Sequence, residues 1–183
     1  MLHCVSGWNV LLLAHWSKGR KEVMSREKQI GKVLAKLEYG VYVVTMGKGN
    51  EGNAFTASWL TQVSNEPPTV VVSINNKHQS ARLLKDLDAF AVNLLPEGQA
   101  EIAKVYYGPA ESGYEKLRAS NVTPAPETGC PLIPGAIGFL DCRIVNRVEA
   151  GSHTVFFGEV LAAELEKDAK VLTSSDSNLR YSG

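Results

Sequence analysis

The sequence predicts a mainly β protein in which antiparallel strands close into a barrel with a few short helices at its ends. About six segments of the 183-residue chain are rich in β-branched or alternating apolar residues, as strands are. Two of their connections, residues 47–52 and 150–152, are short glycine-containing turns of the hairpin kind. Only one helical crossover is predicted, between Ile74 and Phe90, so a parallel βαβ sheet is not favoured.

Residues 24–183 are predicted to form a single domain, and residues 1–23 are interpreted as a non-native or mis-assigned extension that precedes it. Val10–Ala14 is apolar, but it is short and has neither a basic start nor a cleavage site, which argues against a signal peptide. Met24 opens a cleaner beginning. The alternative is an ordered arm whose apolar residues pack on the body or on a partner.

Charge and cysteine content exclude several classes of protein. Lys and Arg together number 19, as do Asp and Glu, and no dense basic run would neutralise nucleic-acid phosphates. Cys4, Cys130 and Cys142 are far apart, so we expect neither a metal site nor a disulfide framework. No apolar run is long enough to span a membrane. A reducing, cytoplasmic location fits best.

The first elements are predicted to be a helix and a hairpin. Ser25–Tyr39 has apolar residues at helical spacing, with Ser25 as N-cap and Gly40 after its end. Val41–Met46 is a β-branched strand, and the turn Gly47–Gly52 leads into the next strand. That turn also matches the G-x-G-x-x-G dinucleotide fingerprint. The fingerprint needs a helix after the turn and an acid after the next strand, and the sequence has neither.

Asn53–Asn75 is predicted to form two strands joined by a loop that ends at Pro67-Pro68. At a two-residue period, Ala54, Thr56 and Ser58 share one face. Such small side chains leave a shallow face on which a flat ligand can lie, with hydroxyl groups to bond it. The alternative is a half-exposed edge strand whose Thr and Ser residues face water.

A helix is predicted from Ser80, which would cap it, to Ala89. Lys77, His78 and Arg82 surround its start, which would make a site for a phosphate. The alternative is a capped helix with solvated charges. The remaining predicted elements are a strand, a short helix, a long irregular segment, a second hairpin and a poorly ordered tail: Phe90–Leu95, Gly98–Tyr107, Gly108–Gly135, Ala136–Glu149 with His153–Glu166, and Lys167–Gly183.

Together these stretches resemble the flavin reductase-like, FMN-binding split-barrel family. The matching pieces, in the family's order between about Gly31 and Val160, are Gly40–Thr45, Thr56–Ser58, Gln62–Ser64, Pro67-Pro68, Val72–Ile74, Ser80, Phe90–Leu95, Cys130-Pro131, Gly151–His153 and Phe157–Val160. Ala57-Ser58-Trp59 is similar to the flavin reductase module of cyanobacterial flavodiiron proteins.

The resemblance implies a six-stranded antiparallel Greek-key split barrel that works as a homodimer and binds FMN without a covalent bond. The strand along the flavin ring would be Asn53, Ala54, Phe55, Thr56, Ala57 and Ser58, whose backbone N–H groups would bond the ring. Ser73, Ile74 and Asn75 would line the ribityl chain, and Lys77 and Ser80 would hold the phosphate. His153 would lie near the flavin and the nicotinamide; the alternative is a turn histidine that bonds the backbone.

The implied activity is hydride transfer from NADH or NADPH to FMN, with reduced flavin or electrons passed to an oxygenase or another acceptor protein. Because the cofactor performs this chemistry, no catalytic side chain is expected. One alternative is an FMN-binding electron carrier without NAD(P)H activity. Another is a ligand-binding barrel of the pyridoxamine-phosphate-oxidase type, or one that binds haem.

Overall fold

A computed structural model describes residues 23–48, 52–108 and 115–179 of the chain. The chain divides into two compact units, residues 1–38 and 39–183. Outside the described ranges lie the predicted extension except its last residue, half of the turn Gly47–Gly52 (residues 49–51), and the last four residues.

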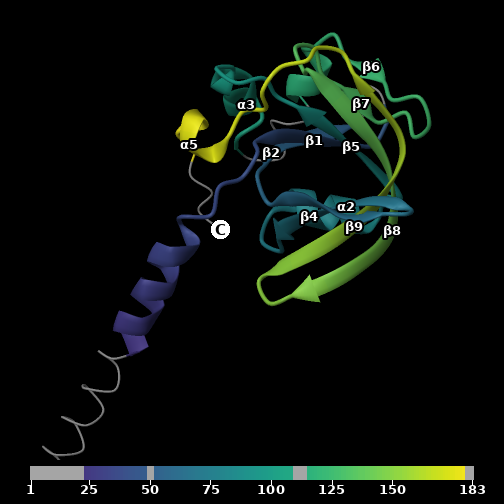
Figure 1. Cartoon of the computed structure of the whole chain (residues 1–183). Helices are drawn as coiled ribbons and strands as arrows, with labels where there is room; N and C mark the ends of the chain where they lie inside the picture. The colour runs from purple at the N-terminus through teal and green to yellow at the C-terminus, as the bar shows by residue number, and fades with distance from the viewer. Residues whose placement is uncertain (1–22, 49–51, 109–114, 180–183) are drawn as a thin grey trace, which may run out of the picture. The chain divides into compact units, whose positions relative to one another are not determined.

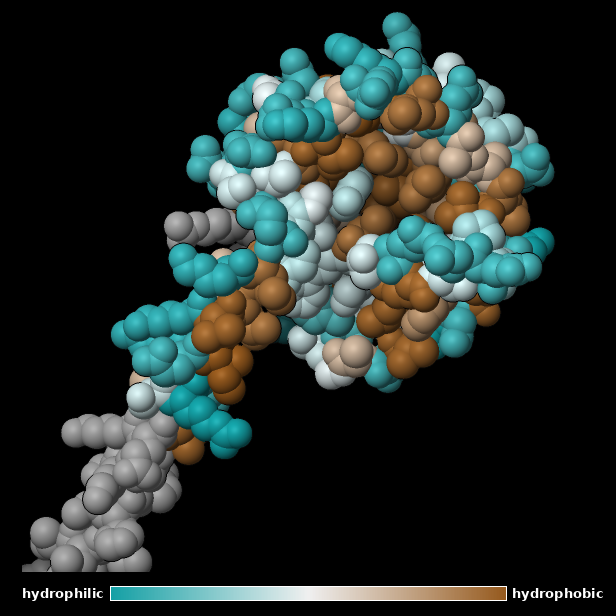
Figure 2. Space-filling view, in the orientation of Figure 1, coloured by the Kyte–Doolittle hydropathy of each residue, from teal (hydrophilic) through white to brown (hydrophobic). Residues whose placement is uncertain are grey.

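Residues 23–34 are helical in the first unit. Ser25 therefore lies inside this helix and is not its N-cap. Ile30, Val33, Leu34 and Leu37 have the predicted helical spacing, but their side chains are between 48 and 70% exposed. Apolar atoms gather along one side of the helix in Figure 2. None of the helices in the described ranges is long and apolar enough to cross a membrane.

The second unit is built on a seven-stranded antiparallel sheet with the order β2-β1-β5-β8-β9-β4-β3. Figure 1 shows the sheet curled into a barrel. The long β8–β9 hairpin connects its two halves, one made of β2, β1, β5 and β8 and the other of β9, β4 and β3. The strands are β1 (Tyr42–Met46), β2 (Asn53–Ala57), β3 (Leu60–Asn65), β4 (Pro68–Asn75), β5 (Ala89–Leu94), β8 (Gly138–Ala150) and β9 (His153–Leu165).

The mainly β, antiparallel prediction is confirmed, and both predicted hairpins are present. The strand count differs because the segment before Pro67-Pro68, predicted as a loop, is strand β3, which pairs with β4. Its polar residues, such as Gln62 and Asn65, hid the strand because an edge strand can turn both faces to water. Two short strands, β6 (Thr123–Pro124) and β7 (Pro131–Leu132), form a separate ribbon in the irregular segment.

The apolar core has two main parts, one on each face of the β1–β2 hairpin. The first fills the barrel interior and includes Phe55, Phe90 and Phe156. The second lies outside the barrel, where α3 (Ala100–Val105) covers β1 and β2, and it includes Leu95 and Leu172. Strand alternation places neighbouring residues of β1 and β2 in different parts of the core.

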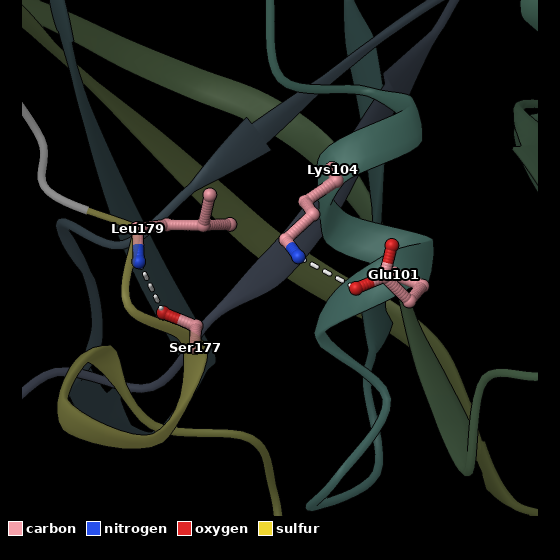
Figure 3. Close-up of polar contacts among 4 residues, drawn as sticks. All are labelled: Glu101, Lys104, Ser177 and Leu179. Atoms are coloured by element: carbon pink, nitrogen blue, oxygen red, sulfur yellow. Dashed lines mark hydrogen bonds and ion pairs between the residues drawn. The ribbon is translucent and has the colours of Figure 1, made fainter.

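The described part of the C-terminal segment, residues 167–179, packs on the rest of its unit, contrary to the prediction of a poorly ordered tail. Leu172 is fully buried; its N–H donates to Leu95 O over 2.8 Å, and its carbonyl accepts Val41 N–H over 2.7 Å. The segment ends in the short helix α5 (Ser174–Ser177). In Figure 3, Leu179 lies beside α3, where Lys104 pairs with Glu101 of the same helix over 2.6 Å.

Buried polar side chains tie the irregular segment to the sheet. Asn93 on β5 donates to Val43 O over 3.1 Å and accepts Ile133 N–H over 2.9 Å. Fully buried Asp141 on β8 accepts the backbone N–H groups of Glu127 and Thr128 over 2.8 and 3.1 Å. These bonds satisfy groups that would otherwise be costly to bury.

Candidate functional site

The face of β2 that carries Ala54 and Thr56 is not the open ligand surface that the sequence suggested. Ala54 is only 2% exposed and belongs to the core beneath α3. The Thr56 hydroxyl donates to Ala103 O over 2.6 Å, and its N–H donates to Tyr106 O over 3.1 Å. Small residues are therefore needed here because a helix packs closely on the strand, which local sequence does not reveal.

The other residues of β2 also have defined partners. Phe55 and Ala57 pack in the barrel interior. The Asn53 side chain accepts the N–H of Ala54 over 2.7 Å. Ser58 is half-buried at the junction with β3, where its carbonyl accepts Leu60 N–H over 3.0 Å. A ligand at this strand would thus meet its C-terminal end around Ser58 rather than its side-chain face.

The end of β4 places Ser73 and Asn75 on the outer face of the barrel, the side turned away from its interior. Ile74, between them, is 3% exposed and packs in the interior core. Asn75 pairs with His153 of β9, so both side chains lie on the outer face. Three of the predicted site residues are therefore brought together, and the Ile74 side chain is turned away from them.

An aromatic stack that the sequence analysis did not predict lies on this same face. The Trp59 and His153 rings are stacked with centroids 4.8 Å apart and planes 27° apart. The Trp59 carbonyl accepts Ser73 N–H over 2.9 Å, which holds the residue beside β4. The signal for this stack in the sequence was a large aromatic residue, Trp59, placed shortly after the small residues Ala54, Thr56 and Ser58.

His153 is held within the β8–β9 turn and is 7% exposed. Its Nδ1 lies 2.8 Å from the Ser152 hydroxyl. Burial, and secondarily the nearby His78, lowers the pKa of the imidazole below its usual value of 6.5. A neutral imidazole is favoured at neutral pH, and it can both donate and accept a hydrogen bond.

The loop between β4 and α2 (Gln79–Lys85) is tied to the same turn. Asn76 N–H donates to Ser152 O over 2.9 Å, and Asn76 Oδ1 accepts the Thr154 hydroxyl over 2.6 Å. The Asn75 side chain accepts Lys77 N–H over 3.0 Å. These bonds fix Lys77 at the edge of the outer face that carries His153.

Ser80 is not the helix cap that was predicted. The N-cap of α2 is His78, which makes no side-chain cap bond, and Ser80 lies inside the first turn at 4% exposure. Lys77 and Arg82 are exposed, and neither forms an ion pair with any acid in the described ranges. The first turn of α2 also contains no acidic residue. The surface around this turn is therefore suited to an anion.

A separate apolar cavity of about 360 Å³ opens between the two halves of the barrel. Its walls come from β1, β3, β4, β5, β8 and β9, and they include Tyr42, Leu60, Val70, Leu94 and Leu140. Figure 2 shows apolar surface around a hollow on this unit. The cavity adjoins the Pro68 end of β4, whereas His153 pairs with the other end, so cavity and candidate site are distinct.

Comparisons of this chain with known proteins all match flavin reductases or proteins with a similar domain. Residues 34–182 match the family described as "Flavin reductase like domain". An NADH-dependent FAD reductase of Streptomyces globisporus is 35% identical over 136 residues, 74% of each chain. An FMN reductase (NADH) of Ancylobacter novellus is 33% identical over 138 residues, 75% of each chain. Diflavin flavoprotein A 1 of Synechocystis is 26% identical, and the match covers 80% of this chain but only 26% of that protein.

Solved structures agree with these matches. The NADH:FAD oxidoreductase SgcE6 of Streptomyces globisporus C-1027, in complex with NAD and FAD fragments, superposes with a TM-score of 0.73 at 30% identity. That match covers 86% of this chain and 93% of the other. BorF, the flavin reductase component of a bacterial two-component tryptophan halogenase, superposes with a TM-score of 0.72 at 26% identity, covering 82 and 94% of the two chains.

Proposed function

The chain belongs to the flavin reductase-like domain family, and we propose that it reduces FMN with NADH or NADPH at the outer face beside His153. Its activity is that of an NAD(P)H-dependent flavin oxidoreductase. One observation supports this location for the flavin site: Asn75 and His153 face each other in a cross-strand pair, and Asn75 holds the backbone of Lys77 next to them.

The residues of this face fit a flavin mononucleotide. Lys77 and Arg82 offer positive charge for the phosphate, free of acidic partners in the described ranges. Because α2 has only seven residues, we assign most of the attraction to these two cations rather than to the helix dipole. Ser73 and Asn75 would line the ribityl chain, and the backbone around Ser58 would meet the ring. Bound FMN would supply the hydride acceptor.

The protein's own part is to bind, orient and exclude water. His153, neutral and held by Ser152, is placed to hydrogen-bond the nicotinamide carboxamide or the flavin edge. Holding donor and acceptor at a fixed distance lowers the entropic cost of the transfer. No proton needs to be moved by a strong acid or base, so we assign no catalytic residue.

The test is oxidation of NADH and NADPH by the purified protein with FMN or FAD, followed by absorbance with and without oxygen. We expect oxidation of a nicotinamide nucleotide that depends on flavin, and bleaching of the flavin colour under anaerobic conditions. Binding of FMN with no reaction with either nucleotide would instead identify an electron carrier. A protein that binds no flavin would contradict the proposal.

We propose that the reduced flavin or its electrons pass to a separate acceptor protein, such as an oxygenase. Two resemblances support this: BorF is named as one component of a two-component halogenase, and in the diflavin flavoprotein the matched region is about a quarter of a longer chain. A coupled assay that measures cytochrome c reduction with and without free FMN would separate transfer by released flavin from direct transfer.

We also propose a homodimer located in the cytoplasm, with residues 1–23 dispensable for the domain. The exposed apolar side chains of Val33 and Leu34 support a partner surface, because such groups are seldom left in water. Free, buried Cys130 and Cys142 suit a reducing compartment. Light scattering on the full chain and on a truncation that starts at Met24 tests the dimer and the dispensability of residues 1–23. A monomeric mass for the full chain would contradict the dimer, and aggregation of the truncated protein would contradict the dispensability.

A further inference from the structure

Trp59 forms the outer layer of a three-ring cluster whose inner member is His153. Trp59 is 37% exposed, whereas His153, stacked on it with centroids 4.8 Å apart, is 7% exposed. The Tyr39 ring also packs against Trp59, with centroids 6.3 Å apart. The indole therefore covers one face of the imidazole and separates it from solvent.

Each residue of the cluster is held in place by hydrogen bonds, through the backbone for Trp59 and Tyr39 and through the ring for His153. The backbone of Trp59 is fixed to β4, since its carbonyl accepts Ser73 N–H. Tyr39 is held by the C-terminal segment: its N–H donates to Ser174 Oγ over 3.2 Å, and its carbonyl accepts Ser174 N–H over 2.8 Å. His153 Nδ1 is paired with Ser152. The indole face and the Ser152 hydroxyl together define both the plane and the rotation of the imidazole.

We propose that Trp59 is a positioning residue that fixes the imidazole plane of His153 and, through it, the nicotinamide end of the electron donor. This inference rests on the proposed function. An aromatic stack restricts a ring that could otherwise turn about two side-chain bonds. Without the indole, the imidazole would sample orientations that do not bond the donor, so donor binding would weaken while the transfer step itself would change little.

Steady-state kinetics of three variants test this role. We expect Trp59→Ala to raise KM for the nicotinamide nucleotide about fivefold, with kcat changed by less than about twofold. Trp59→Phe, which keeps an aromatic face, should stay within about twofold of the wild type on both constants. Val63→Ala, which trims an exposed apolar side chain on neighbouring β3, is the control and should change neither constant.

The decisive comparison uses His153→Ala as a second background. If Trp59 acts through His153, adding Trp59→Ala to His153→Ala should raise KM no further, since the interaction is already lost. An equal rise in both backgrounds would mean that Trp59 contacts the donor directly, and it would overturn the proposal. An unchanged KM for Trp59→Ala in the wild-type background would overturn it too.

A second measurement does not depend on activity. In the flavin-free protein, the His153 ring proton signals should shift when Trp59 becomes Ala and keep most of their ring-current shift in Trp59→Phe. Unchanged signals in Trp59→Ala would overturn the positioning role. A wild-type protein that oxidises neither nucleotide would instead count against the proposed function, while these ring signals would still report whether Trp59 stacks on His153.

Discussion

Replacing Lys77 by Ala should weaken FMN binding much more than riboflavin binding, because only FMN carries a phosphate. A charge-assisted hydrogen bond contributes about 1.5–3 kcal/mol when shielded. The Lys77 side chain is exposed, so we discount this to about 1–1.5 kcal/mol, which corresponds to about a five- to tenfold rise in Kd. Removing Arg82 as well should raise Kd for FMN about 30-fold in total if the two cations act independently.

Quenching of flavin fluorescence during titration measures both constants. Lys85→Ala is the matched control, because it removes a positive charge from the opposite end of α2, where Lys85 lies 3.6 Å from Glu149. We expect this control to leave Kd for FMN within about twofold. Equal loss of FMN and riboflavin binding in Lys77→Ala, or a larger effect of Lys85→Ala, would refute the placement of the phosphate.

Three further predictions concern stability and reactivity. Thr56→Val should lower the free energy of unfolding by about 1 kcal/mol in urea titrations, because the Ala103 carbonyl in α3 loses one of its donors and keeps only backbone N–H contact from Tyr106; no loss would mean that this contact does not stabilise the fold. Burial, with Asp141 beside it, raises the pKa of Cys142 to about 12, and burial also raises the pKa of Cys130. In Cys4→Ser protein a thiol reagent at pH 8 should therefore label neither thiol until the chain unfolds, and rapid labelling of native protein would contradict their burial. The pKa of His153 is lowered in the folded chain, so below pH 6.5 the unfolded chain binds more protons, and the wild-type protein should lose stability as the pH decreases. Thermal unfolding of His153→Gln should show a smaller loss over the same pH range, and an identical loss would contradict the assignment.

The strand pattern could be predicted because alternation and β-branched residues are local signals. Val41–Met46 and the hairpin around Gly151 appear within a few residues of their predicted places. Strand β3 was missed because a polar edge strand and a loop have similar compositions. The order of the tail was missed because Leu172 is buried by pairing with residues far away in the chain, which no local pattern encodes.

The candidate site was predictable only in part. The resemblance named Asn75, Lys77 and His153 as site residues, which stays a prediction, and the pairing of β4 with β9 brings them together. The prediction that the face of β2 with Thr56 is open to a ligand was wrong, because small residues leave room for a close-packed helix as well as for a ligand, and here α3 packs on them. The proposed role of Trp59 was overlooked because it depends on a stacking partner almost 100 residues away, and only the three-dimensional register reveals that partner.

The most direct test of where flavin binds is an NMR titration of the full-length protein with FMN, followed through backbone amide shifts. We predict saturable shifts that are largest at Ser58, at residues 73–80 and 152–153 and at the Trp59 indole N–H. The cavity between the two barrel halves, lined by Val70, Leu94 and Leu140, should be little affected. Largest shifts around that cavity, or no saturable shift at all, would contradict the account.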